Sequence, residues 1–289
     1  MSAADVLLAA RGWVFDVDGC LMRTSRAGGA GGTAYPGAVE LVAALKAAGR
    51  EVLLCTNASG EPPGQYAAHL RQLGFDVADD EFVTAGSAAA DHVHAEHPGA
   101  RVLVLGGAGI TDPMRRLGIE LLDVAADGDG ARADVVVVGA TDGYTAAELD
   151  AACQAVDAGA PLYTTVAARW FHGGVGRSVC VSRAMAAAVA WVTGVEPVVT
   201  GKPSAALAHR LRARFGTDDG AGLVVVGDST AELDLARAMG ARSLLVLSGA
   251  VPESAVAGLQ PAPDLVFPDV GAVRDALTPS LTPAAGVPQ

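Results

Sequence analysis

Two aspartates, Asp16 and Asp18, directly follow an apolar run that begins at Trp13, and Gly19 comes after them. This pattern delivers two carboxylates at the carboxyl end of a buried strand, where open α/β sheets place their active sites. A carboxylate can attack phosphorus and form an aspartyl-phosphate, provided that a cation offsets the repulsion between the two anions and an acid protonates the leaving oxygen. Asp16 and Asp18 suit the roles of nucleophile and acid.

Three further places where strands end carry polar groups, namely Thr56 with Asn57, Lys202, and Asp228 with Glu232. Hydroxyl and amide groups can hydrogen-bond an oxyanion, and the lysine adds a positive charge. Because the carboxyl ends of parallel strands meet at one edge of a sheet, we expect these groups to lie beside the aspartate pair. Together they describe a metal-assisted site for phosphoryl chemistry.

The elements that must position these groups alternate between apolar strands and amphipathic helices, which indicates an α/β fold. We expect a first α/β unit over residues 1–84, a second over 85–198, and a return to the first pattern over 199–278. The stretch Ala168 to Arg177 is expected to be irregular. The tail 279–289, rich in proline and small residues, is expected to be disordered.

Composition excludes several classes of protein. The mean hydropathy is +0.35, but no apolar run reaches the roughly 18 residues of a spanning helix. A net charge of -12 argues against binding to nucleic acid or to an anionic membrane. The start of the chain lacks a basic region typical of a signal peptide, and the four cysteines form no CxxC pair, so we expect a cytoplasmic protein.

Two features of the sequence each allow two interpretations. The glycine-rich loop from Arg26 to Thr33 is suited to lying over a site, but it could equally be a mobile insertion. Cys20 and Cys55 stand next to the motifs, so their oxidation could inhibit the protein, although four free thiols are the simpler interpretation.

In these motifs the chain resembles the haloacid dehalogenase (HAD) superfamily, most closely subfamily IIA, the phosphatases like NagD and 4-nitrophenylphosphatase. The resemblance covers nearly the whole chain and rests on four motifs in order: Asp16 to Gly19, Thr56-Asn57, Gly201-Lys202-Pro203, and Gly227-Asp228 with Glu232. It implies a doubly wound, Rossmann-like parallel-sheet core over residues 1–84 and 199–278, with an α/β cap domain inserted over residues 85–198. The tail 279–289 belongs to neither domain.

The resemblance also implies roles for the motif residues. Asp16 is the nucleophile, and Asp18 is the general acid and then the base for the hydrolytic water. Thr56 and Lys202 hold phosphoryl oxygens, and Asn57 orients the nucleophile loop or the substrate. The implied cofactor is Mg²⁺, which prefers hard oxygen ligands. Its implied ligands are Asp16, the backbone carbonyl of Asp18, Asp228 and Glu232.

The chain departs from the family pattern at two places. The second acid of the last motif usually comes five residues after the first, where this chain has Leu233. We prefer Glu232 to Asp234 because a spacing of four puts it one helical turn from Asp228. In the cap, a segment with Arg169 and Trp170 replaces the acidic loop that is usual in the family. We expect both side chains to bind the substrate. For Trp170, packing at an interface is the alternative.

These inferences predict a Mg²⁺-dependent phosphatase that hydrolyses a small phosphorylated metabolite through an aspartyl-phosphate. The alternative from another class is a HAD-fold ligand-sensing or interaction protein with impaired catalysis. A haloacid dehalogenase fits less well, because loss of halide needs no acid at Asp18. The resemblance allows a homodimer through the cap, and the sequence identifies neither the physiological substrate nor the oligomeric state.

Overall fold

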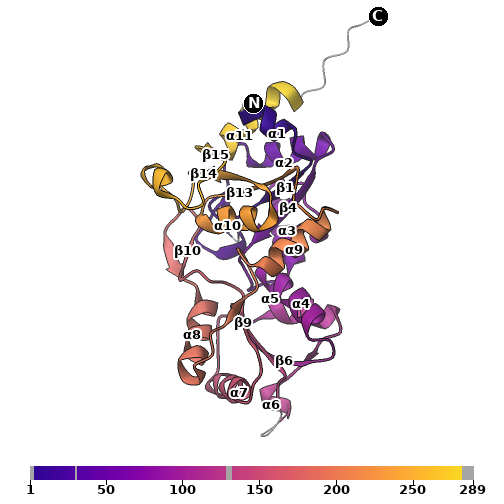
Figure 1. The fold of residues 1–289 in the computed structure, drawn as a ribbon, viewed down its shortest axis with the longest axis vertical. Coiled ribbons are helices and arrows are strands. Elements are labelled where there is room, and N and C mark those ends of the chain that lie inside the picture. The colour runs from indigo at the N-terminus through magenta and orange to yellow at the C-terminus, as the bar shows by residue number, and fades with distance from the viewer. Residues whose placement is uncertain (1–2, 30, 128–131, 282–289) are drawn as a thin grey trace, which may run out of the picture.

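The computed structural model describes residues 3–29, 31–127 and 132–281, and its two main sheets lie one above the other in Figure 1. The first is a six-stranded sheet in the order β15-β14-β13-β1-β4-β5, with every neighbouring pair parallel. Its strands are β1 (Gly12–Phe15), β4 (Glu51–Thr56), β5 (Phe82–Thr84), β13 (Leu223–Gly227), β14 (Arg242–Val246) and β15 (Leu265–Phe267).

Helices cover both faces of this core sheet, which is why its central strands are almost wholly apolar. One face packs against α1 (Ala3–Leu8), α2 (Ala38–Ala47), α3 (Pro63–Gln72) and α11 (Val270–Leu281). The other face packs against α9 (Ala205–Arg214) and α10 (Thr230–Met239). The predicted doubly wound core is confirmed.

The second sheet has five parallel strands in the order β12-β9-β8-β6-β7. They are β6 (Arg101–Leu105), β7 (Glu120–Leu121), β8 (Val135–Val138), β9 (Leu162–Thr164) and β12 (Val198–Val199). Helices α4 (Ala85–Glu96) and α5 (Ala108–Arg116) cover one face, and α7 (Ala146–Asp157) and α8 (Val181–Thr193) cover the other, with α6 (Val124–Asp127) beside α7. This confirms an inserted α/β cap.

The junction between the two units runs through α4. Ala88 packs in the cluster of the core sheet, whereas Ala89, Ala90 and Val93 pack in the cluster of the cap sheet. A single helix therefore contributes to both hydrophobic cores, and the boundaries of the domains at residues 85 and 198 stay a prediction.

Two parts of the sequence interpretation were wrong in detail. The stretch expected to be irregular contains an antiparallel hairpin, β10 (Trp170–His172) with β11 (Arg177–Val179). Its residues are mostly exposed, so the buried alternation that marks a strand is absent. Helix α11 reaches Leu281, so residues 279–281 are helical and not part of a disordered tail, while 282–289 lie outside the described residues.

Short elements complete the chain. The loop after β1 forms a second hairpin, β2 (Met22–Arg23) with β3 (Thr33–Ala34), and the 3-10 turn η1 (Ala27–Gly29) lies between the two strands. Two further 3-10 segments are η2 (Asp79–Glu81) and η3 (Glu253–Gly258). Among the described residues, no helix is both long and apolar enough to span a bilayer.

The core sheet depends on tight packing around β4, where Leu54 is 1% exposed. We expect Leu54→Ala to lower the free energy of unfolding of the core by about 2–5 kcal/mol, because it removes buried methyl groups and leaves a cavity. Leu73→Ala, at a position that is 36% exposed, is the control. Urea titration followed by circular dichroism measures both changes, and equal effects would contradict this packing.

Candidate active site

The carboxyl ends of three neighbouring core strands carry the predicted chemical groups. Asp16 follows β1, Thr56 ends β4, and Asp228 follows β13, while β1 pairs with both β4 and β13. Lys202 lies in the turn between β12 and α9, and Glu232 lies in the first turn of α10. All five side chains are buried, and those of Asp16, Lys202, Asp228 and Glu232 face one another at the sheet edge.

Lys202 is the centre of this cluster. Its ammonium group donates to the carboxylate of Asp16 and pairs with Oε1 of Glu232 at 2.8 Å. It also donates to the backbone carbonyl of Cys55 at 2.8 Å. Burial alone would lower the pKa of Lys202, but the carboxylates of Asp16 and Glu232 raise it well above its usual value. The lysine is therefore held as a cation.

The carboxylates outnumber this cation. Asp16, Asp228 and Glu232 each offer an oxygen within 4.8 Å of the others. Burial raises the pKa of Asp16 well above its usual value, and burial together with Glu232 raises that of Asp228 to about 7. One ammonium group does not compensate three ionised acids, so these acids favour the protonated form unless a further cation is bound. Hard oxygen donors of this kind suit a divalent cation such as Mg²⁺. This group could hold a metal.

The carboxylate of Asp228 lies between Gly19 and Gly249. A Cβ atom on Gly19 would lie 2.3 Å from Oδ2 of Asp228, and one on Gly249 would lie 1.8 Å from it. The same oxygen accepts from the amide of Ala250 at 2.6 Å. Only glycine leaves room for the carboxylate at these two positions.

Glu232 and Asp234 lie in different surroundings. Glu232 is buried, and its Oε2 accepts from the amide and the hydroxyl of Ser229 at 3.2 and 2.6 Å, which caps α10. Its other oxygen faces Lys202. Asp234 is exposed. Helix α10 begins at Thr230, so Asp228 precedes the helix, and the spacing of four residues still brings Glu232 to Asp228. The choice of Glu232 as a ligand stays a prediction.

Asp18 is held by three donors. The amide of Gly28 and the hydroxyl of Thr56 donate to its Oδ2, both at 2.9 Å, and the amide of Gly29 donates to Oδ1 at 2.7 Å. Burial raises the pKa of Asp18, and the two amides act in the opposite direction. The hydroxyl of Thr56, predicted to hold a phosphoryl oxygen, is directed at Asp18 in this structure.

Asn57 contacts the main chain of Lys202 from both sides. Its Oδ1 accepts from the Lys202 amide at 2.8 Å, and its Nδ2 donates to the Lys202 carbonyl at 3.2 Å. The roles predicted for Asn57 were to orient the nucleophile loop or the substrate, whereas the contacts in the structure are with the turn that carries Lys202.

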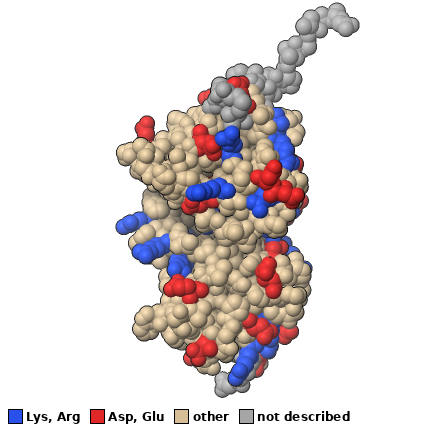
Figure 2. Space-filling model, viewed as in Figure 1, with Lys and Arg blue, Asp and Glu red and all other residues tan. Residues whose placement is uncertain are grey.

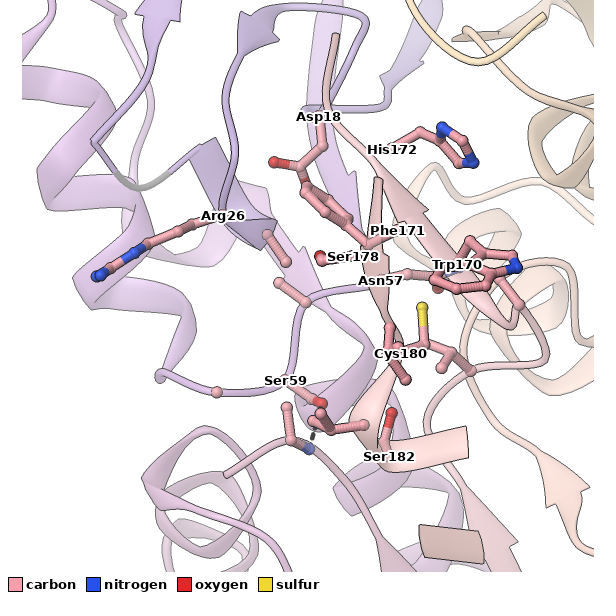
Figure 3. Close-up of a pocket in the computed structure, with 18 of the residues that line it drawn as sticks. Asp18, Arg26, Asn57, Ser59, Trp170, Phe171, His172, Ser178, Cys180 and Ser182 are labelled. Carbon is pink, nitrogen blue, oxygen red and sulfur yellow. Dashed lines mark hydrogen bonds between the residues drawn. The ribbon is translucent and has the colours of Figure 1, made fainter. Parts of the chain in front are cut away.

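A cavity of about 750 Å³ extends from Asp16 and Lys202 into the cap. Figure 3 shows its cap wall, in which Trp170, Phe171 and His172 from β10 lie near Cys180 and Ser182. Trp170 is 43% exposed, and the guanidinium of Arg177 stacks 4.3 Å from the centroid of its ring. Arg169, the other predicted substrate contact, is exposed and is not among the lining residues.

Gly28, Gly29 and Arg177 also contribute to this region, although none of them stands in a motif that identifies it in the sequence. The glycine-rich composition of residues 26–33 was the available signal for the first two, although composition does not reveal which amides converge on which carboxylate. Cys20 and Cys55 are free and buried, and burial raises the pKa of both thiols, which disfavours the reactive thiolate. Inhibition by oxidation of these cysteines is therefore not supported.

Comparison with known proteins agrees with this geometry. Residues 13–120 match the family Haloacid dehalogenase-like hydrolase, and residues 199–273 match the family HAD-hydrolase-like. Chronophin of Homo sapiens is 30% identical over 254 residues, which cover 85% of this chain and 83% of chronophin. The chain belongs to the haloacid dehalogenase-like hydrolases.

Solved structures place it further within that family. The 4-nitrophenylphosphatase of Thermotoga maritima superposes with a TM-score of 0.82 at 25% identity, covering 94% of this chain and 99% of the other. The glycerol phosphate phosphatase of Mycobacterium tuberculosis, solved in complex with magnesium, superposes with a TM-score of 0.80 at 26% identity, covering 93% and 77%. This chain is thus a HAD-type phosphatase of the NagD and 4-nitrophenylphosphatase group.

The contacts of Asn57 predict the effect of removing its side chain. We expect Asn57→Ala to lower kcat/KM for a phosphate monoester by roughly tenfold or more, because two hydrogen bonds to the Lys202 main chain are lost. Steady-state release of inorganic phosphate measures the change. Thr141→Ala, at another position that lines the cavity, is the control. An unchanged kcat/KM in Asn57→Ala would contradict the orienting role.

Proposed function

We propose that this protein is a Mg²⁺-dependent phosphatase that hydrolyses a small phosphate monoester through an aspartyl-phosphate on Asp16. The observation that carries the proposal is the convergence of Asp16, Lys202, Asp228 and Glu232 at one buried sheet edge that opens into the cavity. The magnesium-bound relative and the relative named for 4-nitrophenyl phosphate support the metal and the substrate class.

In the first step, a carboxylate oxygen of Asp16 attacks phosphorus while the bond to the leaving oxygen breaks. Asp18 gives its proton to that oxygen, and the product alcohol departs. The ammonium of Lys202 lies against Asp16, so it can balance the charge of the phosphoryl oxygens there. Asn57 fixes the main chain of Lys202 and thereby the reach of its side chain.

In the second step, the carboxylate of Asp18 takes a proton from a water molecule, which attacks phosphorus and breaks the bond to Asp16. Phosphate is released and Asp16 is regenerated. Asp16, the backbone carbonyl of Asp18, Asp228 and Glu232 would hold Mg²⁺, which when bound offsets the negative charge of the carboxylates and the phosphate. The cap residues that line the cavity would limit access of bulk water once the cap closes over a bound substrate.

The cap supplies the surface for the leaving group. Trp170 lines the cavity and stays the proposed contact, whereas Arg169 is placed less well for it than the sequence suggested. Figure 2 shows Lys and Arg side chains gathered at the waist of the molecule, at the level of β10 in Figure 1. Positive charge at this level would favour the approach of an anionic metabolite to a protein with a net charge of -12.

The cytoplasmic location and the homodimer through the cap also stay proposals. Four free cysteines among the described residues fit a reducing compartment. Trp191, Val192 and Val198 are exposed apolar residues of the cap, with Trp191 at 87%, and they support an interface there.

Phosphate release tests the proposed reaction. We expect the protein with Mg²⁺ to hydrolyse some members of a panel of small phosphate monoesters, and we expect Asp16→Asn to lose at least about a thousandfold in kcat, because the nucleophile is removed. The panel includes 4-nitrophenyl phosphate and glycerol 3-phosphate. Chelation of the metal should abolish activity in the wild type. Absence of release from every member would favour the ligand-sensing alternative.

The assignment of the last metal ligand predicts an ordered pair of variants. We expect Glu232→Gln to raise the Mg²⁺ concentration for half-maximal activity by about tenfold or more, because a ligand charge is removed. Asp234→Asn should leave that concentration within about twofold of wild type, since its side chain is exposed and does not belong to the acidic cluster of Asp16, Asp228 and Glu232. Titration of activity with Mg²⁺ measures this concentration for both variants. A larger increase in Asp234→Asn than in Glu232→Gln would contradict the assignment.

A further inference from the structure

The glycine-rich segment after β2 contacts the acid of the site. Each carboxylate oxygen of Asp18 has a donor from the backbone of this segment: Gly28 for Oδ2 and Gly29 for Oδ1. With Thr56 donating to Oδ2 as well, rotation of the carboxyl group is restricted. In Figure 3 the carboxyl group of Asp18 points toward the segment that carries Arg26.

The backbone of this turn requires glycine. Gly28 has φ +81° and Gly29 has φ +78°, a region that other residues enter only with strain. A Cβ atom on Gly28 would lie 2.2 Å from the ring of Tyr66, so the turn is also packed closely against α3. The two amides that face Asp18 are therefore presented by a specific, packed conformation.

The other end of the same segment rests on the cap. The amide of Thr24 donates to the carbonyl of Gly173 at 2.7 Å, and Thr24 forms a bridge with Gly174 in the turn of the cap hairpin. The hydroxyl of Thr24 accepts from the amide of Arg26 at 3.0 Å and donates to its carbonyl at 2.9 Å. A continuous run of contacts thus leads from the cap hairpin through Thr24 and Arg26 to the turn at Asp18.

We propose that the segment Thr24–Gly29 positions the side chain of Asp18 for proton transfer and that the cap hairpin β10–β11 keeps this segment in place. The inference rests on the proposed function, in which Asp18 is the acid. Gly28 and Gly29 act as positioning residues through their amides and Gly173 acts through Thr24. Contact between cap and core would then orient the acid while the cavity is covered.

The dependence on the leaving group separates positioning of the acid from general damage. An alkoxide leaving group needs a proton, whereas 4-nitrophenolate leaves readily without one, so a misplaced acid affects alkyl phosphates more. The two substrates are glycerol 3-phosphate, or another alkyl monophosphate that the wild type hydrolyses, and 4-nitrophenyl phosphate. The measured quantity is kcat/KM, which covers the steps up to formation of the aspartyl-phosphate.

Gly29→Ala is the main variant, because its added Cβ would meet only side-chain atoms at 3.2 Å or more, whereas a Cβ on Gly28 would clash with the ring of Tyr66. We expect its loss of kcat/KM on the alkyl phosphate to exceed its loss on 4-nitrophenyl phosphate by about tenfold or more. Gly31→Ala is the matched control, since Gly31 also has positive φ, +68°, but a Cβ atom added there would have no atom within 4 Å. It should change both values by less than about twofold.

The hairpin is tested in the same way. A Cβ on Gly173 would lie 2.3 Å from the carbonyl oxygen of Thr24, so Gly173→Ala should disturb the segment and give the same selective loss. Val175→Ala, at a position 56% exposed in the same turn, should not. Thermal unfolding of each variant checks that the fold is retained.

Asp18→Asn sets the reference for loss of the acid. If Asp18→Asn is selective for the alkyl phosphate and Gly29→Ala is not, the inference fails while the proposed function stands. If Asp18→Asn itself loses equally on both substrates, the acid role fails and the inference fails with it. If Gly29→Ala is selective and Gly173→Ala is not, the part assigned to the cap hairpin is overturned.

Discussion

The buried contact of Lys202 with Asp16 and Glu232 is the interaction on which the rest of the site depends. Burying several charges is costly, and removing one partner would leave the others uncompensated in a region of low polarity. The chain meets this cost by bringing residues from β1, α10 and the turn after β12 to a single point. The ion pair thereby ties the N-terminal and C-terminal parts of the core sheet together.

The order of the strands in the core sheet is what brings these charged residues together. β1 pairs in parallel with β4 on one side and with β13 on the other, so the carboxyl ends of all three strands lie at the same edge of the sheet. The cap is inserted where it can face that edge. The main chain returns from the cap through β12, directly before Lys202. The lysine therefore lies at the junction of the two units, and Asn57 fixes that junction from the side of β4.

Much of this arrangement could be predicted from the sequence because it depends on local pattern. Apolar runs followed by Asp16, Thr56 and Asp228 are strand ends, and parallel strands bring such ends together. The hairpin around Trp170 could not be recognised, since it buries little surface and shows no alternation. The contacts of Gly28 and Gly29 with Asp18 depend on backbone angles and tertiary packing, which composition does not encode.

The two aspartates after β1 have distinct surroundings, and these explain the separate roles that we propose for them. Asp16 faces a lysine and two other acids, whereas Asp18 faces two amides and a hydroxyl. The first environment suits a nucleophile beside a cation, and the second suits an acid held in one orientation. Environment, rather than residue type, separates them.

The most direct measurement is chemical trapping of the covalent intermediate. The enzyme is mixed with substrate and Mg²⁺, quenched during turnover and treated with borohydride, which reduces an aspartyl-phosphate to homoserine, and the peptides are analysed by mass spectrometry. We predict homoserine at position 16 and at no other aspartate. Modification at Asp18 or Asp228 in place of Asp16, or turnover with no trapped residue, would contradict the account.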